Sequence, residues 1–183
     1  QSHNESIYSK VKTTTAKRIK FVEEQCKRVA NVVSKTISEG YFSVILSGDH
    51  SSALGSISGI KAANPNLRLG IIWIDAHADL HSPYTTPSGN VHGMPLAIAL
   101  KEDNQENAIN ELDQSTQDAW ETICGTKSIK AEDIVFFGVR DTEIPEDELI
   151  LAKGIKNISV EELRLKGAKQ ATQEALEYLE SCD

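Results

Sequence analysis

The segment that most constrains this chain is an apolar run, residues 69–74, followed at once by the string DAHAD at residues 75–79. The run reads LGIIWI and has no polar alternation, which is typical of a strand buried on both faces of a parallel sheet. Open sheets of that kind bind ligands at the carboxyl ends of their strands. The acids and the histidine of residues 75–79 therefore stand where a functional site is expected.

Further apolar runs, rich in strand-forming residues, predict the rest of a sheet. The predicted strands cover residues 42–46, 69–74, 134–139 and 155–158. Apolar residues at three- and four-residue steps predict helices over residues 9–39, about 52–63, and a last one whose end covers residues 174–180, with Gly40 as the cap that ends the first. Strands that alternate with helices indicate an α/β fold with right-handed crossovers, in a single domain over residues 1–183.

The segment at residues 102–126 is acidic and only weakly periodic. We interpret it as a surface insertion that is partly helical around Ile109, Leu112 and Trp120. The first predicted helix is basic, and we interpret its cations as a solvated helix face rather than a binding patch. They are Lys10, Lys12, Lys17, Arg18, Lys20, Lys27, Arg28 and Lys35.

Composition excludes several classes of protein. The chain has 183 residues, of which 39% are hydrophobic and 25% charged, as in ordinary globular domains. It contains neither an 18-residue apolar run nor a basic start followed by an apolar stretch, so neither a membrane span nor an intact signal peptide is expected. A net charge of −8 argues against nucleic acid as a partner. Three widely spaced cysteines without a CxxC motif indicate reduced thiols in a cytoplasmic protein.

The DAHAD string has the composition of a metal site. If the strand stays extended, Asp75, His77 and Asp79 point to one side. Two carboxylates near one imidazole repel each other unless a positive charge lies between them, and a divalent cation supplies it. His50, in the string SGDHS after the strand at 42–46, is a fourth candidate ligand, and carboxylate-rich sites often hold two ions. A solvated loop is the alternative, but the position after two strands favours a metal site.

A second polar loop, TTPSGNVHG at residues 85–93, follows the DAHAD string. Gly89 and Gly93 permit tight backbone geometry, and four side chains offer polar groups, namely Thr86, Ser88, Asn90 and His92. A histidine on such a loop is more often merely exposed. Next to a metal-activated hydroxide, however, an imidazole group is suited to carry protons.

Together these strings resemble the arginase family of ureohydrolases. The likeness rests on LSGDHS (46–51), IDAHAD (74–79) and SGNVHG (88–93), with support from residues 54–59 and 137–141. The DAHAD string marks ureohydrolases in general, whereas the SGNVHG loop is similar to arginases rather than agmatinases or formimidoylglutamases. The resemblance implies a three-layer α/β/α fold with a mainly parallel sheet, and hydrolysis of the guanidinium group of L-arginine to L-ornithine and urea. Another ureohydrolase and a truncated inactive relative remain the alternatives.

The resemblance also implies a metal centre with two Mn²⁺ ions. Asp75 would bridge the ions, with His50 and Asp79 on one of them and His77 on the other. Asp79 would in addition hydrogen-bond the hydroxide that bridges the ions, and His92 would shuttle protons.

The substrate contacts follow from the same resemblance. Thr86, Ser88 and Asn90 match positions that bind the α-carboxylate of the amino acid, and Glu143 and Glu146 match positions that hold its α-amino group. Ser47 replaces a glycine that usually precedes Gly-Asp-His, which is a small change. His81 replaces an asparagine of animal arginases that contacts the carboxylate, and Glu143 replaces a common aspartate. These last two departures affect the expected substrate selectivity but leave the metal ligands unchanged.

Parts of the family pattern have no counterpart in this sequence. They are the first strand of the fold, a second DxD ligand motif on a later strand, and a glutamate that pairs with the guanidinium group. We therefore expect an incomplete polypeptide, which binds Mn²⁺ weakly and has negligible activity alone. The family likeness further implies a homo-oligomer, a trimer or a hexamer, when the protein is complete.

Overall fold

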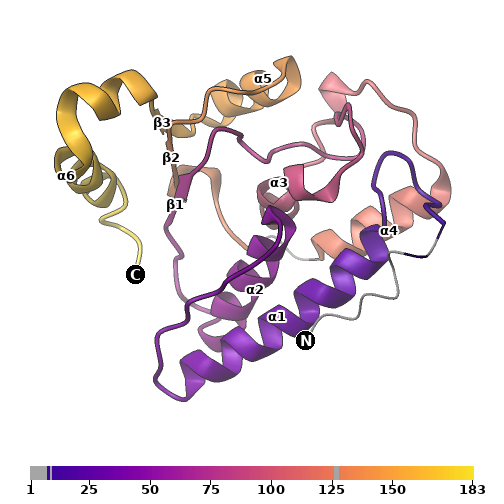
Figure 1. Ribbon diagram of the computed structural model, residues 1–183, viewed down its shortest axis with the longest axis horizontal. Helices are drawn as coiled ribbons and strands as arrows, with labels where there is room; N and C mark the ends of the chain where they lie inside the picture. The colour runs from indigo at the N-terminus through magenta and orange to yellow at the C-terminus, as the bar shows by residue number, and fades with distance from the viewer. Residues whose placement is uncertain (1–7, 9, 126–127) are drawn as a thin grey trace. The chain divides into compact units, whose positions relative to one another are not determined.

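The structure is a computed structural model that describes residues 8, 10–125 and 128–183 (Figure 1). The chain forms two compact units. The first contains Gln1–Pro65 and Asp79–Ser128, and the second contains Asn66–Ala78 and Ile129–Asp183. Both units are discontinuous in sequence, so the backbone passes from one to the other at three points. The second of these points is the peptide bond between Ala78 and Asp79, inside the DAHAD string.

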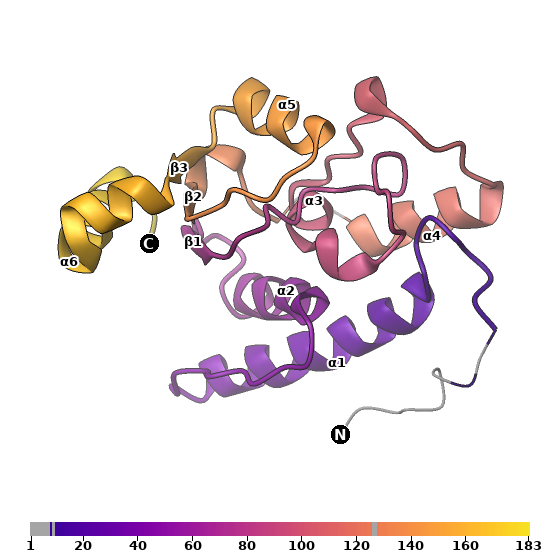
Figure 2. The same ribbon diagram turned by 45° about the horizontal axis from the view of Figure 1, so that its top comes forward.

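The first unit is helical. Helix α1 (Ile19–Ser38) and helix α2 (Ala53–Ala63) lie side by side in both views (Figures 1 and 2). Helix α3 (Pro95–Leu100), with all six residues buried, contacts α2, and helix α4 (Gln114–Cys124) contacts α1 and α3. Short 3₁₀ turns complete the unit, namely η2 (His50–Ser52), η3 (Val91–Gly93) and η4 (Gln105–Asn107).

Two glycines allow α1 and α2 to approach closely. A Cβ atom at Gly59 would lie 2.7 Å from the carbonyl oxygen of Ala30, and one at Gly55 would lie 2.8 Å from that of Cys26. Both contacts are with backbone atoms of α1, which cannot move aside as a flexible side chain does. The spacing of these glycines, one helical turn apart, therefore sets the distance between the two helices.

The second unit is built on a parallel sheet. Strands β1 (Ile71–Ile74), β2 (Ile134–Phe137) and β3 (Lys156–Ile158) pair in the order β1-β2-β3, with Ile71 opposite Ile134. The 3₁₀ turn η5 (Ala131–Asp133) precedes β2, and helices α5 (Ile144–Lys153) and α6 (Val160–Tyr178) follow β2 and β3. Helix α6 covers one face of the sheet, where Ala171 and Ala175 pack on Val135 and Phe137. The predicted α/β fold with a parallel sheet is confirmed.

An ion pair joins the segments that lead into β1 and β2. The guanidinium group of Arg68 donates to both carboxylate oxygens of Asp133, through Nε at 3.0 and 3.1 Å and Nη2 at 2.7 Å. Asp133 is almost completely buried, and its hydrogen bond to Arg68 raises the pKa of that guanidinium above its ordinary value. The two segments are thereby fixed where the sheet begins.

Two predicted elements differ from the structure. Residues 42–46, predicted as a strand, have no regular structure, and the side chains of Phe42 and Leu46 are 91% and 95% exposed. Apolar composition alone does not make a strand, because a strand also needs a neighbour to pair its backbone groups. The first helix begins at Ile19 rather than near residue 9, since Arg18 adopts a left-handed conformation (φ 59°) that a helix interior does not allow. Ser9 itself lies outside the described residues.

The end of the first helix is confirmed. Gly40 (φ 83°) donates to the carbonyl of Ile37, and Tyr41 donates to that of Thr36, which is the pattern of a Schellman cap. The segment at 102–126 is not a mere surface insertion, because α4 buries Thr116, Ala119 and Trp120. Ile109 is 62% exposed and lies outside any helix.

Burial of the strands also departs in part from expectation. All four residues of β2 are buried, as predicted, whereas in β1 only Trp73 is buried and Ile74 is 76% exposed. The reason is that β1 lies at one end of the strand order in the described sheet, and β2 lies in the middle. Among the described residues, no helix combines the length and apolar character needed to cross a bilayer.

The close contact of α1 and α2 gives a test of the fold. Gly59→Ala should lower the free energy of unfolding by about 1–3 kcal/mol, because the new methyl group overlaps the backbone of α1. Helix propensity alone predicts the opposite, a gain of up to about 1 kcal/mol. Urea unfolding followed by circular dichroism measures the difference. Ser58→Ala, on the same helix, should change the stability by less than about 0.5 kcal/mol. A Gly59→Ala variant as stable as the parent would contradict the packing described here.

Candidate metal centre

His50 is presented by a turn that the residues around it hold in place. Asp49 has an extended backbone and caps η2, since its Oδ1 accepts a hydrogen bond from the amide of Ser51 at 3.0 Å and another from the Ser51 hydroxyl. Ser47 and Ser52 hydrogen-bond each other through their hydroxyl groups across the same turn. Asp49 thus acts as a capping residue, and the imidazole of His50 is left partly exposed.

Asp79 is held by its backbone as well as by its side chain. Its φ of 52° is left-handed, a conformation that aspartate tolerates better than most residues and that is often found at functional sites. Its carbonyl oxygen accepts hydrogen bonds from the amides of Leu96 at 3.2 Å and Ala97 at 3.4 Å, at the start of α3. The backbone that carries the carboxylate is therefore fixed by the buried helix α3.

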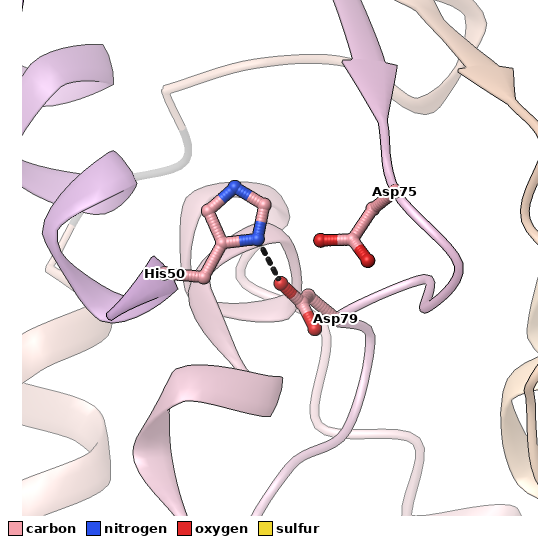
Figure 3. A group of neighbouring side chains, drawn as sticks. All are labelled: His50, Asp75 and Asp79. Carbon is pink, nitrogen blue, oxygen red and sulfur yellow. Dashed lines mark ion pairs between the residues drawn. The ribbon is translucent and has the colours of Figure 1, made fainter. Parts of the chain in front are cut away.

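The two side chains meet within the first unit. Nδ1 of His50 lies 2.8 Å from Oδ2 of Asp79, and the residue Asp79 is only 5% exposed (Figure 3). Two donor atoms bound to one ion at about 2.1 Å, in directions about 90° apart, are about 3 Å from each other. A buried carboxylate is also costly without a positive partner. In donor type, separation and burial, this pair fits a divalent cation.

The other two candidate ligands belong to the second unit. Asp75 follows β1, and its Oδ1 accepts from the amide of His77 at 3.0 Å and lies 3.3 Å from Nδ1 of the same residue. The other ring nitrogen of His77, Nε2, lies 3.4 Å from Oδ2 of Asp141, in the loop after β2. The amides of Arg140 and Asp141 donate to the carbonyl of Ala76 at 2.8 and 2.9 Å, which ties this loop to the segment that carries His77.

The geometry of the DAHAD string differs from the prediction. We expected an extended strand that points Asp75, His77 and Asp79 to one side. The strand instead ends at Ile74, the side chain of Asp75 turns back to the amide of His77, and Asp79 is left-handed. The alternation argument is therefore wrong, because turn hydrogen bonds replace the extended backbone that it assumed.

The polar loop of residues 85–93 lies in the first unit, as does His81 before it. The turn η3, which carries His92, packs beside η2, which carries His50. His92 itself is exposed. His81 is buried, with Nδ1 3.1 Å from the hydroxyl of Thr85. Thr86 is also buried, and its hydroxyl accepts from the amide of Gly89 at 3.0 Å.

The tip of this loop is covered by the segment that leads into α1. Lys17 donates from its amide to the carbonyl of Gly89 at 2.8 Å and from Nζ to Oδ1 of Asn90 at 3.4 Å. A Cβ atom at Gly89 (φ 73°) would lie 1.8 Å from the carbonyl oxygen of Thr14, so only glycine fits. Ser88 is exposed and accepts from the amide of Asn90 at 3.2 Å. Sequence reasoning missed Lys17, which it grouped with the solvated cations of the first helix.

Glu143 and Glu146 have a structural role at the start of α5. They form a capping box, in which Glu143 is the N-cap and the side chain of Glu146 accepts from the amide of Glu143 at 3.4 Å. Glu146 is almost completely buried, whereas Glu143 is exposed. A glutamate three residues after the N-cap belongs to the capping-box signature, but the N-cap position usually holds serine, threonine, aspartate or asparagine.

The cysteines take no part in these clusters. All three are free thiols, as predicted, and Cys26 and Cys124 are buried. Burial raises the pKa of Cys26 to about 11 and that of Cys124 to about 12, so neither forms a thiolate near neutral pH.

Comparison with known proteins agrees with the strings noted in the sequence. The sequence model that describes the Arginase family matches residues 2–183. Rat arginase-1 is 40% identical over 153 residues, which are 84% of this chain and 44% of the rat protein. The arginase of Bacillus subtilis is 36% identical over 86% of this chain and 48% of its own length. The chain therefore belongs to the arginase family, and it spans about half the length of these relatives.

Solved structures of arginases resemble the structure of this chain. The arginase of Bacillus caldovelox superposes with a TM-score of 0.79 at 31% identity, over 100% of this chain and 56% of that protein. The arginase of Entamoeba histolytica, solved in complex with L-ornithine, gives a TM-score of 0.75 at 29% identity, over 95% of this chain and 55% of that protein. The expected arginase-like α/β fold is confirmed.

The contact between His77 and Asp141 gives a prediction for a residue that sequence reasoning did not single out. A carboxylate on the far nitrogen of a ligating histidine orients the ring and raises its basicity. If His77 is a metal ligand, Asp141→Asn in the full-length gene product should weaken binding of a divalent cation by about 10-fold, as measured by calorimetric titration. Glu148→Gln, which removes one exposed negative charge from α5 in the same unit, is the control and should change the affinity by less than about 2-fold. Equal losses in both variants would reduce the role of Asp141 to its charge alone.

Proposed function

We propose that this chain supplies metal ligands and substrate-binding residues of an arginase, which hydrolyses the guanidinium group of L-arginine to L-ornithine and urea. The observation that carries the proposal is the buried carboxylate of Asp79 beside Nδ1 of His50 at 2.8 Å, in a chain of the arginase family. Asp75 and His77 precede Asp79 by four and two residues in the same string, and they complete the ligand set that we propose. Carboxylate and imidazole are ligands that Mn²⁺ accepts.

Two Mn²⁺ ions would be held by four side chains, those of His50, Asp75, His77 and Asp79. When bound, the ions supply a nucleophile from water at neutral pH and positive charge beside the reacting carbon. Asp79, fixed by α3 and by its left-handed backbone, would hold the nucleophile in place through a hydrogen bond to its carboxylate.

His92 would carry the protons of the reaction. Its turn lies beside that of His50, and its ring is exposed, so it can exchange protons with solvent. It would deliver a proton to the departing amino group of the substrate and take one from water in the next cycle. This division separates the residues that hold the ions from the residue that moves protons.

The polar loop would bind the amino acid end of the substrate. Thr86, Ser88 and Asn90 offer hydroxyl and amide groups for the α-carboxylate, on a loop that Gly89 and the segment before α1 hold in shape. Glu143 and Glu146 would hold the α-amino group from the start of α5. The complex of the Entamoeba histolytica arginase with L-ornithine supports an amino acid ligand for this family. His81 would tune the selectivity from its buried position.

A substrate panel tests the proposed reaction. The full-length gene product, loaded with Mn²⁺, should release urea from L-arginine, and its kcat/KM for agmatine should be at least about 100-fold lower, because agmatine leaves the carboxylate-binding groups unpaired. A preference for agmatine or a formimino compound would assign the chain to another kind of ureohydrolase. Absence of hydrolysis of any of these compounds would identify a catalytically inactive relative.

The division of roles between the histidines is tested separately. His92→Ala should lower kcat by about 10²–10⁴-fold, the usual worth of a general acid–base group, while the Mn²⁺ content stays unchanged. His77→Ala should lose both metal and activity, because it removes a ligand. Metal analysis of the purified variants, beside a urea assay, measures the two effects. If both variants lost metal equally, His92 would be acting as a ligand and not as a proton carrier.

A further inference from the structure

A cavity of about 520 Å³ opens in the first unit at the start of α1. It lies apart from the residues proposed to bind metal. Its lining is strongly cationic and comes from the segment before α1, the first turns of α1 and the start of α4. The lining residues are Lys10, Lys12, Thr13, Arg18, Ile19, Lys20, Phe21, Glu24 and Ser115.

Three lysines of this cavity have no acidic partner in the described part of the chain. No described carboxylate lies within ion-pair distance of Lys10, Lys12 or Lys20. Glu24, the acidic residue of the lining, faces Arg28 at 3.7 Å. This local excess of positive charge occurs in a chain with a net charge of −8. This positive charge would attract an anion to the cavity.

The cations farther along α1 behave differently. Lys27, Arg28 and Lys35 each pair with a glutamate one turn away, namely Glu23, Glu24 and Glu39. These residues match the solvated helix face that the sequence predicts. Lys10, Lys12 and Lys20 show no such pairing, so the basic segment divides into a helix face of paired cations and a cavity whose three lysines lack an acidic partner among the described residues.

The start of α1 adds to the positive potential. The helix has 20 residues, no acidic residue in its first turn and no side-chain cap on its amides. The amino end of such a helix carries a partial positive charge that favours anions. Arg18, Lys20 and Phe21, which line the cavity, come from this first turn.

The cavity also has an apolar wall. Ile19 is buried, and Phe21 is 43% exposed and offers an aromatic surface. The volume falls in the range of cavities that bind small molecules, about 300–1,000 Å³, and a concave cavity of this size suits a compact ligand better than a polymer. We propose that it binds a small organic polyanion, with two or more phosphate or carboxylate groups held by the cations and an apolar portion against Phe21.

Calorimetric titration of the chain in EDTA tests this proposal, with inorganic triphosphate and ATP as probes. EDTA removes divalent metal, so the result does not depend on the proposed arginase function. ATP should bind measurably and more tightly than triphosphate, because only ATP has an aromatic portion. The affinity should fall as the salt concentration rises.

Matched variants locate the binding. The double variant Lys12→Gln/Lys20→Gln should weaken ATP binding by about 10-fold or more, because each lost cation removes a charge-assisted contact. Lys27→Gln/Lys35→Gln, which makes the same change of charge farther along α1, should weaken it by less than about 2-fold. Phe21→Ser should lower the affinity for ATP toward that for triphosphate. Circular dichroism and thermal melting confirm that the variants fold.

Three results would overturn the proposal. They are equal losses in the two double variants, no binding of ATP at millimolar concentration, and equal affinities of the parent chain for ATP and triphosphate. The first would identify general attraction to a basic helix, the second an empty cavity, and the third an anion site without an organic portion.

Discussion

The candidate metal centre depends on what stabilises the negative charge of the Asp79 carboxylate. The group is buried, and its nearest partner is the imidazole of His50 at 2.8 Å. Water has little access to a carboxylate in that position, so hydrogen bonds, positive charge from the protein or a bound cation must stabilise it. The neighbouring structure keeps it there nevertheless. The backbone of Asp79 receives the first amides of α3, and its left-handed φ leaves little freedom to turn outward. An arrangement that is costly on its own becomes reasonable when a divalent ion supplies the missing charge.

Much of this could be read from the sequence. The parallel sheet followed from the apolar runs that became β1, β2 and β3, because buried strands need continuous apolar sequence. The end of the first helix followed from Gly40. In each case a local pattern has one dominant physical meaning.

Other features depended on information that local patterns do not contain. Residues 42–46 have the composition of a strand, but pairing depends on a neighbour that the run itself does not specify. The alternation expected for Asp75, His77 and Asp79 assumed that the strand continued through residue 79. The side chain of Asp75 instead accepts a hydrogen bond from the amide of His77, and local bonds of this kind compete with the pairing of strands. The packing of Trp120 and the contact of Asp141 with His77 arise from tertiary structure. Residues 137–141 entered the sequence analysis only as support for the family resemblance, and no role was predicted for Asp141.

The interleaving of the two units has a consequence for how this chain folds. The second unit begins with residues 66–78, is interrupted by fifty residues of the first, and resumes at Ile129. Strand β1 must therefore wait for β2, 63 positions later in the sequence, before its backbone finds the partner seen in the structure. Neither unit can be completed in order as the polypeptide leaves the ribosome, and such long-range closure slows folding. During that delay the LGIIWI run lacks the partner strand that it has among the described residues, and apolar runs in that state are prone to self-association. Slow synthesis or a chaperone that holds this run would therefore be expected to raise the yield of native protein.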